Sequence, residues 1–162
     1  MRLRPLACLL LALAAAPAAA TFHLTQIVEV FPGSAANPQA QYVVIRAYAA
    51  GQNLVGGHSV TVYGADGASL GSFAFPGIVA NGADQMRILV ATPQAVTLFG
   101  LPAADLAMTP VLQAAGGKVC FETIDCVAWG SYAGADPSVG TPFTSPAAPA
   151  AGTAARGLVP GR

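Results

Sequence analysis

Residues 118–129, Lys-Val-Cys-Phe-Glu-Thr-Ile-Asp-Cys-Val-Ala-Trp, place two short apolar runs on either side of a polar turn. The spacing predicts a β-hairpin with strands over 118–121 and 124–129 and a turn centred on Thr123. Folding this hairpin sets Cys120 opposite Cys126, where Cβ atoms of facing residues lie about 4.5–5.5 Å apart. We therefore predict a disulfide between them, favoured by the closer, non-hydrogen-bonded register. The alternative is a pair of buried free thiols.

The predicted disulfide is structural. Closing so short a loop stabilises a fold by about 2 kcal/mol in the chain-entropy model. A redox pair is typically closer in sequence, as in C-x-x-C.

Period-two alternation continues upstream of the hairpin, whereas long helical patterns are missing. In His23 to Phe31 it places Leu24, Gln26, Val28 and Val30 on one face and Thr25, Ile27, Glu29 and Phe31 on the other. An Asp-Gly turn predicts a second hairpin, and a short helical turn is expected after Pro93, closing near Gly100. The other predicted strands cover 42–48, 58–63, 70–75 and 86–91. This succession of short strands predicts an all-β sandwich or barrel over residues 21–132.

Both ends of the chain have a different composition. Arg2 and Arg4 precede an apolar run of 11 residues, Leu6 to Ala16, and small residues follow up to Ala20. This is the pattern of a secretory signal peptide over residues 1–20, cleaved between Ala20 and Thr21. A membrane anchor is the alternative, but a span takes about 20 apolar residues. Residues 133–162 are rich in Pro, Ala and Gly, which predicts a disordered tail.

Charge and cysteine content limit the classes of partner and the location that this protein can have. Without residues 1–20 the chain keeps five of its seven Lys+Arg against seven Asp+Glu, a net charge of about −2. No basic patch is present to follow a nucleic-acid backbone, and no later run is long and apolar enough to span a bilayer. Two cysteines remain, an even number that favours a disulfide in a secreted protein. We predict secretion, to the exterior or the cell surface.

The residues that catalysis requires are few and scattered. His58 and Ser59 are neighbours on a predicted strand, so their side chains point to opposite faces. Asp125 lies inside the last strand, and we interpret it as a partly buried carboxylate with local hydrogen bonds rather than as an acid/base residue. Trp129 with Tyr132 is either part of the core or a sugar-binding surface. No catalytic, cofactor or metal-binding residues are predicted, because glycine motifs for phosphates and ligand sets for Zn²⁺ or Ca²⁺ are missing.

The order of several motifs resembles the lamin-tail domain, a family that also occurs in exported bacterial proteins. The resemblance covers roughly residues 24–130 and includes Ile27-Val28-Glu29-Val30, 42–48, 52–58, 73–76, Asn81-Gly82 ahead of 86–91, and 124–130. It implies an immunoglobulin-like β-sandwich that works as an adhesion or interaction module, with no catalytic residues to transfer. Departures from the family pattern occur at Arg46, where an acid is common, at His58, which replaces a Trp, and at Gly117, where an Asp is common.

The function predicted from these observations is a secreted, non-catalytic binding or structural module. Its partner is an unidentified extracellular protein or carbohydrate, and no cofactor is expected. Two alternatives stay open, a small exported hydrolase and a fragment of a larger extracellular protein. The Ala and Gly richness is typical of a high-GC bacterial genome.

Overall fold

The computed structural model describes residues 22–134 and 136. The predicted signal peptide, its cleavage site between Ala20 and Thr21, and the predicted tail beyond residue 136 lie outside the described residues. Three residues of the predicted tail, 133, 134 and 136, are described. Two of them bond to the domain: the Ala133 N–H donates to the Ala65 carbonyl (2.8 Å), and Asp136 pairs with Lys118 (2.7 Å).

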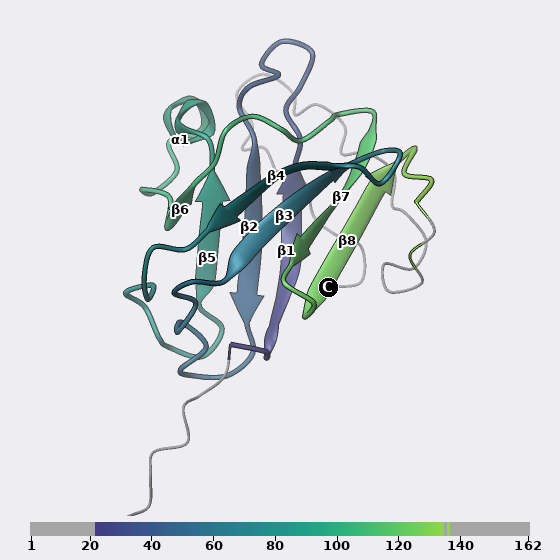
Figure 1. Ribbon diagram of the computed structural model, residues 1–162. Helices are drawn as coiled ribbons and strands as arrows, with labels where there is room; N and C mark the ends of the chain where they lie inside the picture. The colour runs from purple at the N-terminus through teal and green to yellow at the C-terminus, as the bar shows by residue number, and fades with distance from the viewer. Residues whose placement is uncertain (1–21, 135, 137–162) are drawn as a thin grey trace, which may run out of the picture.

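Two four-stranded sheets pack face to face as a β-sandwich (Figure 1). The first sheet has the order β1-β2-β5-β6 and the second the order β4-β3-β7-β8, and all neighbours are antiparallel except β5 and β6. The elements are β1 (Thr25–Phe31), β2 (Tyr42–Ala47), β3 (Ser59–Gly64), β4 (Ser69–Ala74), β5 (Arg87–Ala91), α1 (Pro93–Phe99), β6 (Leu106–Ala107), β7 (Gly116–Phe121) and β8 (Asp125–Gly130). These two packed sheets confirm the prediction of an all-β sandwich.

The main core lies between the sheets and is built from the alternate, inward-facing residues of both. Trp129 and Phe121 are among its fully buried side chains, and the Trp129 indole N–H donates to the Gln113 carbonyl (2.9 Å). A buried tryptophan keeps a hydrogen-bond partner in this way. Trp129 is therefore a core residue and not part of a sugar-binding surface.

The predicted strands and the helical turn all appear, with ends shifted by up to two residues. The helix begins after Thr92, whose Oγ1 accepts the Ala95 N–H (3.2 Å), with Pro93 in its first turn, and it ends at Gly100 in the left-handed conformation (φ 60°). Both ends follow ordinary capping rules. The two-residue strand β6 was not predicted, because so short a run carries no periodicity of its own.

The predicted alternation in the first strand is wrong, because β1 contains a β-bulge. The register between β1 and β2 shifts between Ile27 and Glu29. Ile27 and Val30 therefore both face the main core, whereas Val28 and Phe31 belong to a second apolar cluster on the outer face. A bulge adds one unpaired residue and reverses which later residues face inward. Glu29, predicted to share a face with Ile27, lies opposite Val44 on the outer side.

A buried glutamine ties the loops together at one end of the sandwich. The Gln41 Nε2 lies 3.2, 2.8 and 2.8 Å from the carbonyls of Pro32, Pro38 and Leu112, and its Oε1 accepts the Leu112 N–H at 2.8 Å. The amide thereby meets backbone groups that no strand partner satisfies, as buried polar groups require.

Candidate functional site

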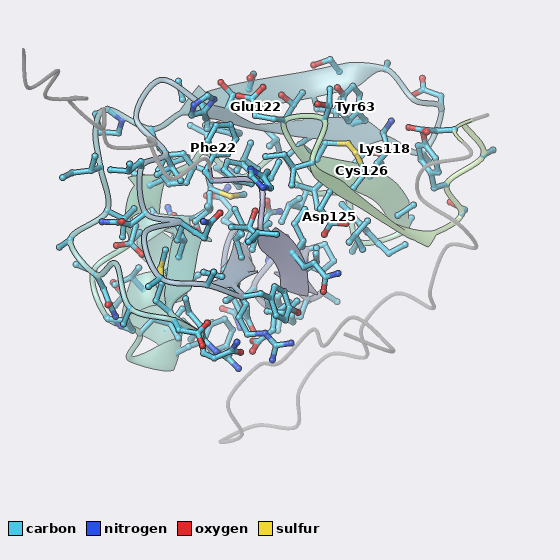
Figure 2. All side chains as sticks on the ribbon, turned by 90° about the horizontal axis from the view of Figure 1, so that it is seen from below. Phe22, Tyr63, Lys118, Glu122, Asp125 and Cys126 are labelled. Atoms are coloured by element: carbon cyan, nitrogen blue, oxygen red, sulfur yellow. A yellow bond between two sulfur atoms is a disulfide. The ribbon has the colours of Figure 1, made fainter. Side chains whose placement is uncertain are left out.

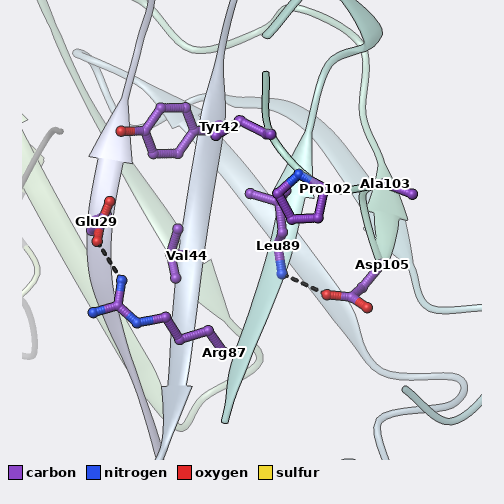
Figure 3. A pocket seen from close by; sticks show the side chains of 9 residues that line it. Glu29, Tyr42, Val44, Arg87, Leu89, Pro102, Ala103 and Asp105 are labelled. Atoms are coloured by element: carbon purple, nitrogen blue, oxygen red, sulfur yellow. Dashed lines mark hydrogen bonds and ion pairs between the residues drawn. The ribbon is translucent and has the colours of Figure 1, made fainter. Parts of the chain in front are cut away.

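A pocket of about 400 Å³ opens on the outer face of the first sheet (Figure 3). Its walls come from β1, β2 and β5 and from the segment between α1 and β6. The helix and this segment pack on the outer apolar cluster and leave the pocket beside them. The lining residues are Glu29, Tyr42, Val44, Arg87, Leu89, Leu101, Pro102, Ala103 and Asp105. Most of this lining is apolar, with charged groups at its two ends.

An ion pair between Glu29 and Arg87 forms one end of the pocket. The Arg87 Nη1 lies 2.6 Å from the Glu29 Oε1. Only 6% of the Glu29 side chain is exposed, against 52% of Arg87. A buried carboxylate needs such a partner because an unpaired charge is costly away from water. The bulge in β1 places Glu29 here, so the pair depends on that irregularity.

Asp105 forms the other end and is held by the edge of β5. Its Oδ2 accepts the Leu89 N–H (2.8 Å), and its own N–H donates to the Leu89 carbonyl (2.9 Å). The backbone N–H and carbonyl of Leu89 therefore both point away from β2, and Asp105 lies on the other side of β5. Glu29, Val44 and Leu89 face one another across three strands. Two strand spacings, together about 10 Å, separate Glu29 on β1 from Leu89 on β5, and Asp105 lies on the far side of Leu89.

The Glu29 and Asp105 carboxylates are therefore not arranged on either side of one scissile bond. Glycosidases hold theirs about 5–9.5 Å apart, on either side of the bond. Here Glu29 is bonded to Arg87 and Asp105 to the backbone of β5. Figure 3 shows both carboxylates directed toward these partners, at opposite sides of the pocket.

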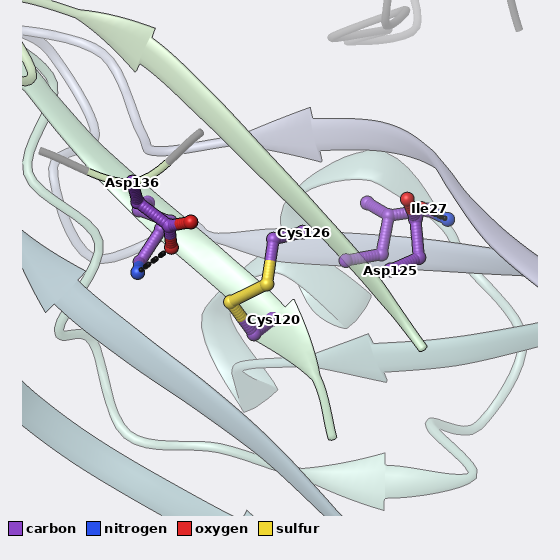
Figure 4. Close-up of a disulfide and its surroundings, with 6 residues drawn as sticks. Ile27, Cys120, Asp125, Cys126 and Asp136 are labelled. Atoms are coloured by element: carbon purple, nitrogen blue, oxygen red, sulfur yellow. Dashed lines mark hydrogen bonds and ion pairs between the residues drawn. A yellow bond between two sulfur atoms is a disulfide. The ribbon is translucent and has the colours of Figure 1, made fainter. Parts of the chain in front are cut away.

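Cys120 and Cys126 form a disulfide, as the hairpin spacing predicts (Figure 4). They are direct cross-strand partners on β7 and β8, with a Cα–Cα distance of 4.1 Å. The short distance is that of closely approaching facing residues in an antiparallel pair.

Asp125 is partly buried, as predicted, and it also has a long-range hydrogen bond that the sequence does not predict. Its Oδ2 accepts the Ile27 N–H at 2.7 Å, a contact between residues 98 apart in the chain. This bond joins β8 of the second sheet to β1 of the first (Figure 4). The carboxylate thus caps an outward N–H of an edge strand and helps to close one side of the sandwich.

His58 is a half-exposed residue just before β3, and its neighbours are an aromatic ring and an acid. The Phe22 ring lies 3.6 Å from the His58 ring, centroid to centroid, and the His58 Nδ1 lies 3.7 Å from the Glu122 Oε1. Glu122 also accepts the Ser59 backbone N–H. The histidine therefore contacts Phe22 and Glu122. Within residues 22–134 and 136, no three His, Cys, Asp or Glu side chains gather as a metal site would require.

A second charged cluster surrounds Lys118, the single lysine of the chain (Figure 2). Its Nζ lies 2.7 Å from the Asp136 Oδ2, and 4.3 and 5.7 Å from the ring centroids of Tyr63 and Tyr132. Burial lowers the pKa of the Lys118 ammonium, but its hydrogen bonds to Asp136 and Tyr132 outweigh burial and leave the pKa above its usual 10.5. The cluster fastens residue 136 to the second sheet.

Comparison with protein-family models, with curated proteins and with solved structures finds no match for this chain. The lamin-tail resemblance accordingly stays a prediction. Among the helices of the described residues, none has the length and apolar content that crossing a membrane would take.

Proposed function

We propose that this protein is a secreted, non-catalytic module of lamin-tail, immunoglobulin-like type that binds a component outside the cell. The observation that carries the proposal is the pocket on the outer face of the first sheet. Concave sites with an apolar floor and a few fixed polar groups are the usual form of a binding site. The partner is an extracellular protein or a carbohydrate.

The chemistry of the pocket favours binding over catalysis. Its nine lining residues include no Ser, Cys, His or Lys, the side chains that most often act as nucleophile or base. Its carboxylates are engaged by Arg87 and by the Leu89 N–H. The charged side chains at the ends of the pocket are placed to hold the polar end of a ligand, while the apolar floor, which includes Val44 and Leu89, contacts its apolar part.

The disulfide supports the proposed location. Disulfides persist in oxidising compartments and are rare in the cytosol. The bridge between Cys120 and Cys126 therefore agrees with the predicted signal peptide, which would carry the chain to such a compartment.

Site-specific photocross-linking on intact secreting cells tests the proposal. A benzophenone amino acid replaces Ala103, which lines the pocket, and in a control replaces Ala80, which is exposed elsewhere. We expect a defined adduct from position 103 that is missing from position 80. Equal adducts from both positions, or none, contradict a binding role for the pocket.

The hydrolase alternative has its own readout. Turnover of nitrophenyl esters or glycosides by the purified mature chain, abolished by Glu29→Gln, would overturn the non-catalytic assignment.

A further inference from the structure

Two arginines face each other directly on the outer face of the first sheet. Arg46 on β2 and Arg87 on β5 are cross-strand partners. The next residue pair is bonded, with the Ala47 N–H donating to the Met86 carbonyl (2.9 Å). Arg46 and Arg87 therefore form a non-hydrogen-bonded pair, the position at which facing side chains approach most closely. Like charges at this position repel each other and destabilise a sheet.

This placement is unexpected in a chain with so few cations. The sequence has seven Lys+Arg, of which the described residues include Arg46, Arg87 and Lys118. Two of these three are paired at a position where each repels the other. A local arrangement that opposes stability, in a sequence otherwise consistent with its fold, is a mark of a functional site.

Arg46 lies beside the pocket, and its contacts with Tyr48 fix its side chain in place. Arg46 lies two residues from the pocket residue Val44 on the same face of β2. Its Nη2 donates to the Tyr48 hydroxyl (2.6 Å), its guanidinium carbon lies 4.7 Å from the Tyr48 ring centroid, and that hydroxyl donates to the Gln26 Oε1 (2.6 Å). The Arg46 Nε is buried with no hydrogen-bond partner. The side chain is thus fixed in place with its hydrogen-bonding capacity incompletely used.

Arg87 has N–H donors that its bond to Glu29 does not use. A guanidinium carries five N–H donors in a planar fork, and Arg87 uses one Nη on Glu29 while half of its side chain is exposed. Glu29 and Arg87 line this end of the pocket, and Arg46 beside it brings the net charge of the three side chains to +1. Asp105 places a negative charge at the far end. Between the two ends lies the apolar floor.

We propose that the pocket binds an apolar carboxylate, with the carboxylate bridging Arg46 and Arg87 and the apolar body lying over Val44 and Leu89 toward Pro102. This inference rests on the proposed binding function and specifies its ligand. Arginine forks match carboxylate geometry, which explains two arginines in place of lysines. A volume of about 400 Å³ suits a small molecule or the last residues of a peptide. Asp105 disfavours a second anionic group at the far end.

Titration calorimetry of the mature chain tests the ligand class with defined probes. Octanoate supplies a free apolar acid, and acetyl-Ala-Ala-Leu-Leu with a free carboxyl group supplies a peptide terminus. Octan-1-ol and the C-terminal amide of the same peptide are their uncharged counterparts. We expect at least one acid to bind about tenfold or more tightly than its counterpart, because charge-assisted hydrogen bonds discriminate to this extent. The acid that binds more tightly identifies the source of the carboxylate.

Substitutions at the arginine pair give effects of opposite sign. Arg46→Gln weakens binding of the acid about tenfold, whereas Glu29→Gln strengthens it, because Arg87 no longer shares its donors with Glu29. Lys118→Gln removes the same charge from the other sheet and leaves affinity unchanged. The double substitution Glu29→Gln with Arg87→Gln avoids a buried unpaired carboxylate and weakens binding without unfolding. Backbone amide spectra confirm the fold of each variant.

The proposal is overturned when both acids bind no better than their counterparts, or when Arg46→Gln and Lys118→Gln have equal effects. If the position-103 adduct still forms in that case, the pocket binds a ligand of another class. If no adduct forms either, the binding function also fails.

Discussion

The bond between Asp125 and Ile27 predicts a specific loss of stability when it is removed. Asp125→Ala deletes the acceptor 2.7 Å from the Ile27 N–H, and Ile27 is fully buried (0% exposed), so the N–H loses its charged partner with little access to water. Hydrogen bonds to charged groups contribute about 1.5–3 kcal/mol, and an unsatisfied buried donor costs a comparable amount. We expect a free energy of unfolding lower by about 2–3 kcal/mol. Asp125→Asn keeps an acceptor oxygen and loses about 1 kcal/mol.

Urea unfolding followed by fluorescence measures this effect, since Trp129 is the single tryptophan and lies in the core. With an m-value of about 1–3 kcal/mol/M, the midpoint for Asp125→Ala falls by about 1 M or more. Asp84→Ala is the matched control, because Asp84 is exposed and, within the described part of the chain, its hydrogen bonds go to its neighbour Gln85. We expect a change below about 0.5 kcal/mol. Equal midpoints for the Ala variants at 125 and 84 would refute the role of Asp125 as a link between the sheets.

Three further predictions concern the disulfide, the lysine cluster and the buried glutamine. The mature protein should weigh two hydrogens less than its reduced form, and replacing Cys120 and Cys126 by Ala should lower stability by about 2 kcal/mol; free thiols in the unfolded, unreduced chain would contradict this. Because the pKa of Lys118 is raised in the folded state, its contribution is complete below pH 10.5 and is lost as pH rises through the folded-state pKa, so stability measured against pH should decline there in the native chain and not in Lys118→Met. Gln41→Leu leaves the Leu112 N–H without its acceptor and should destabilise by about 2–4 kcal/mol in urea, whereas the exposed Gln94→Leu should change little.

Much of the local structure follows from short stretches of sequence. The alternation in 58–63 and 70–75 and the Asp-Gly turn between them define one hairpin, and 118–129 defines the other. Thr92, Pro93 and Gly100 carry the capping signals of the helix. In each case the residues that interact are neighbours in the chain, so the pattern itself contains the information.

The irregular features of the fold, the bulge in β1 and the short strand β6, cannot be predicted from a local sequence pattern. Strict alternation places Glu29 with Ile27, but the bulge in β1 turns Glu29 outward. The bulge is fixed by how β1 pairs with β2. Likewise, the two residues of β6 become a strand only because β5 offers a parallel edge.

The sequence by itself determined the all-β class, the two hairpins and the facing cysteines, because these depend on periodicity and turn chemistry within a few residues. The tertiary structure decided the candidate site. Glu29, Arg87 and Asp105 line one pocket although they lie on three separate segments. The β1-β2-β5 pairing and the bulge place Glu29 and Arg87 there, with Arg46 beside them, and the bonds to Leu89 place Asp105. The physical reason is that strand register acts across long stretches of chain: a shift by one residue exchanges the faces of a strand, and no local pattern records which partner sets it.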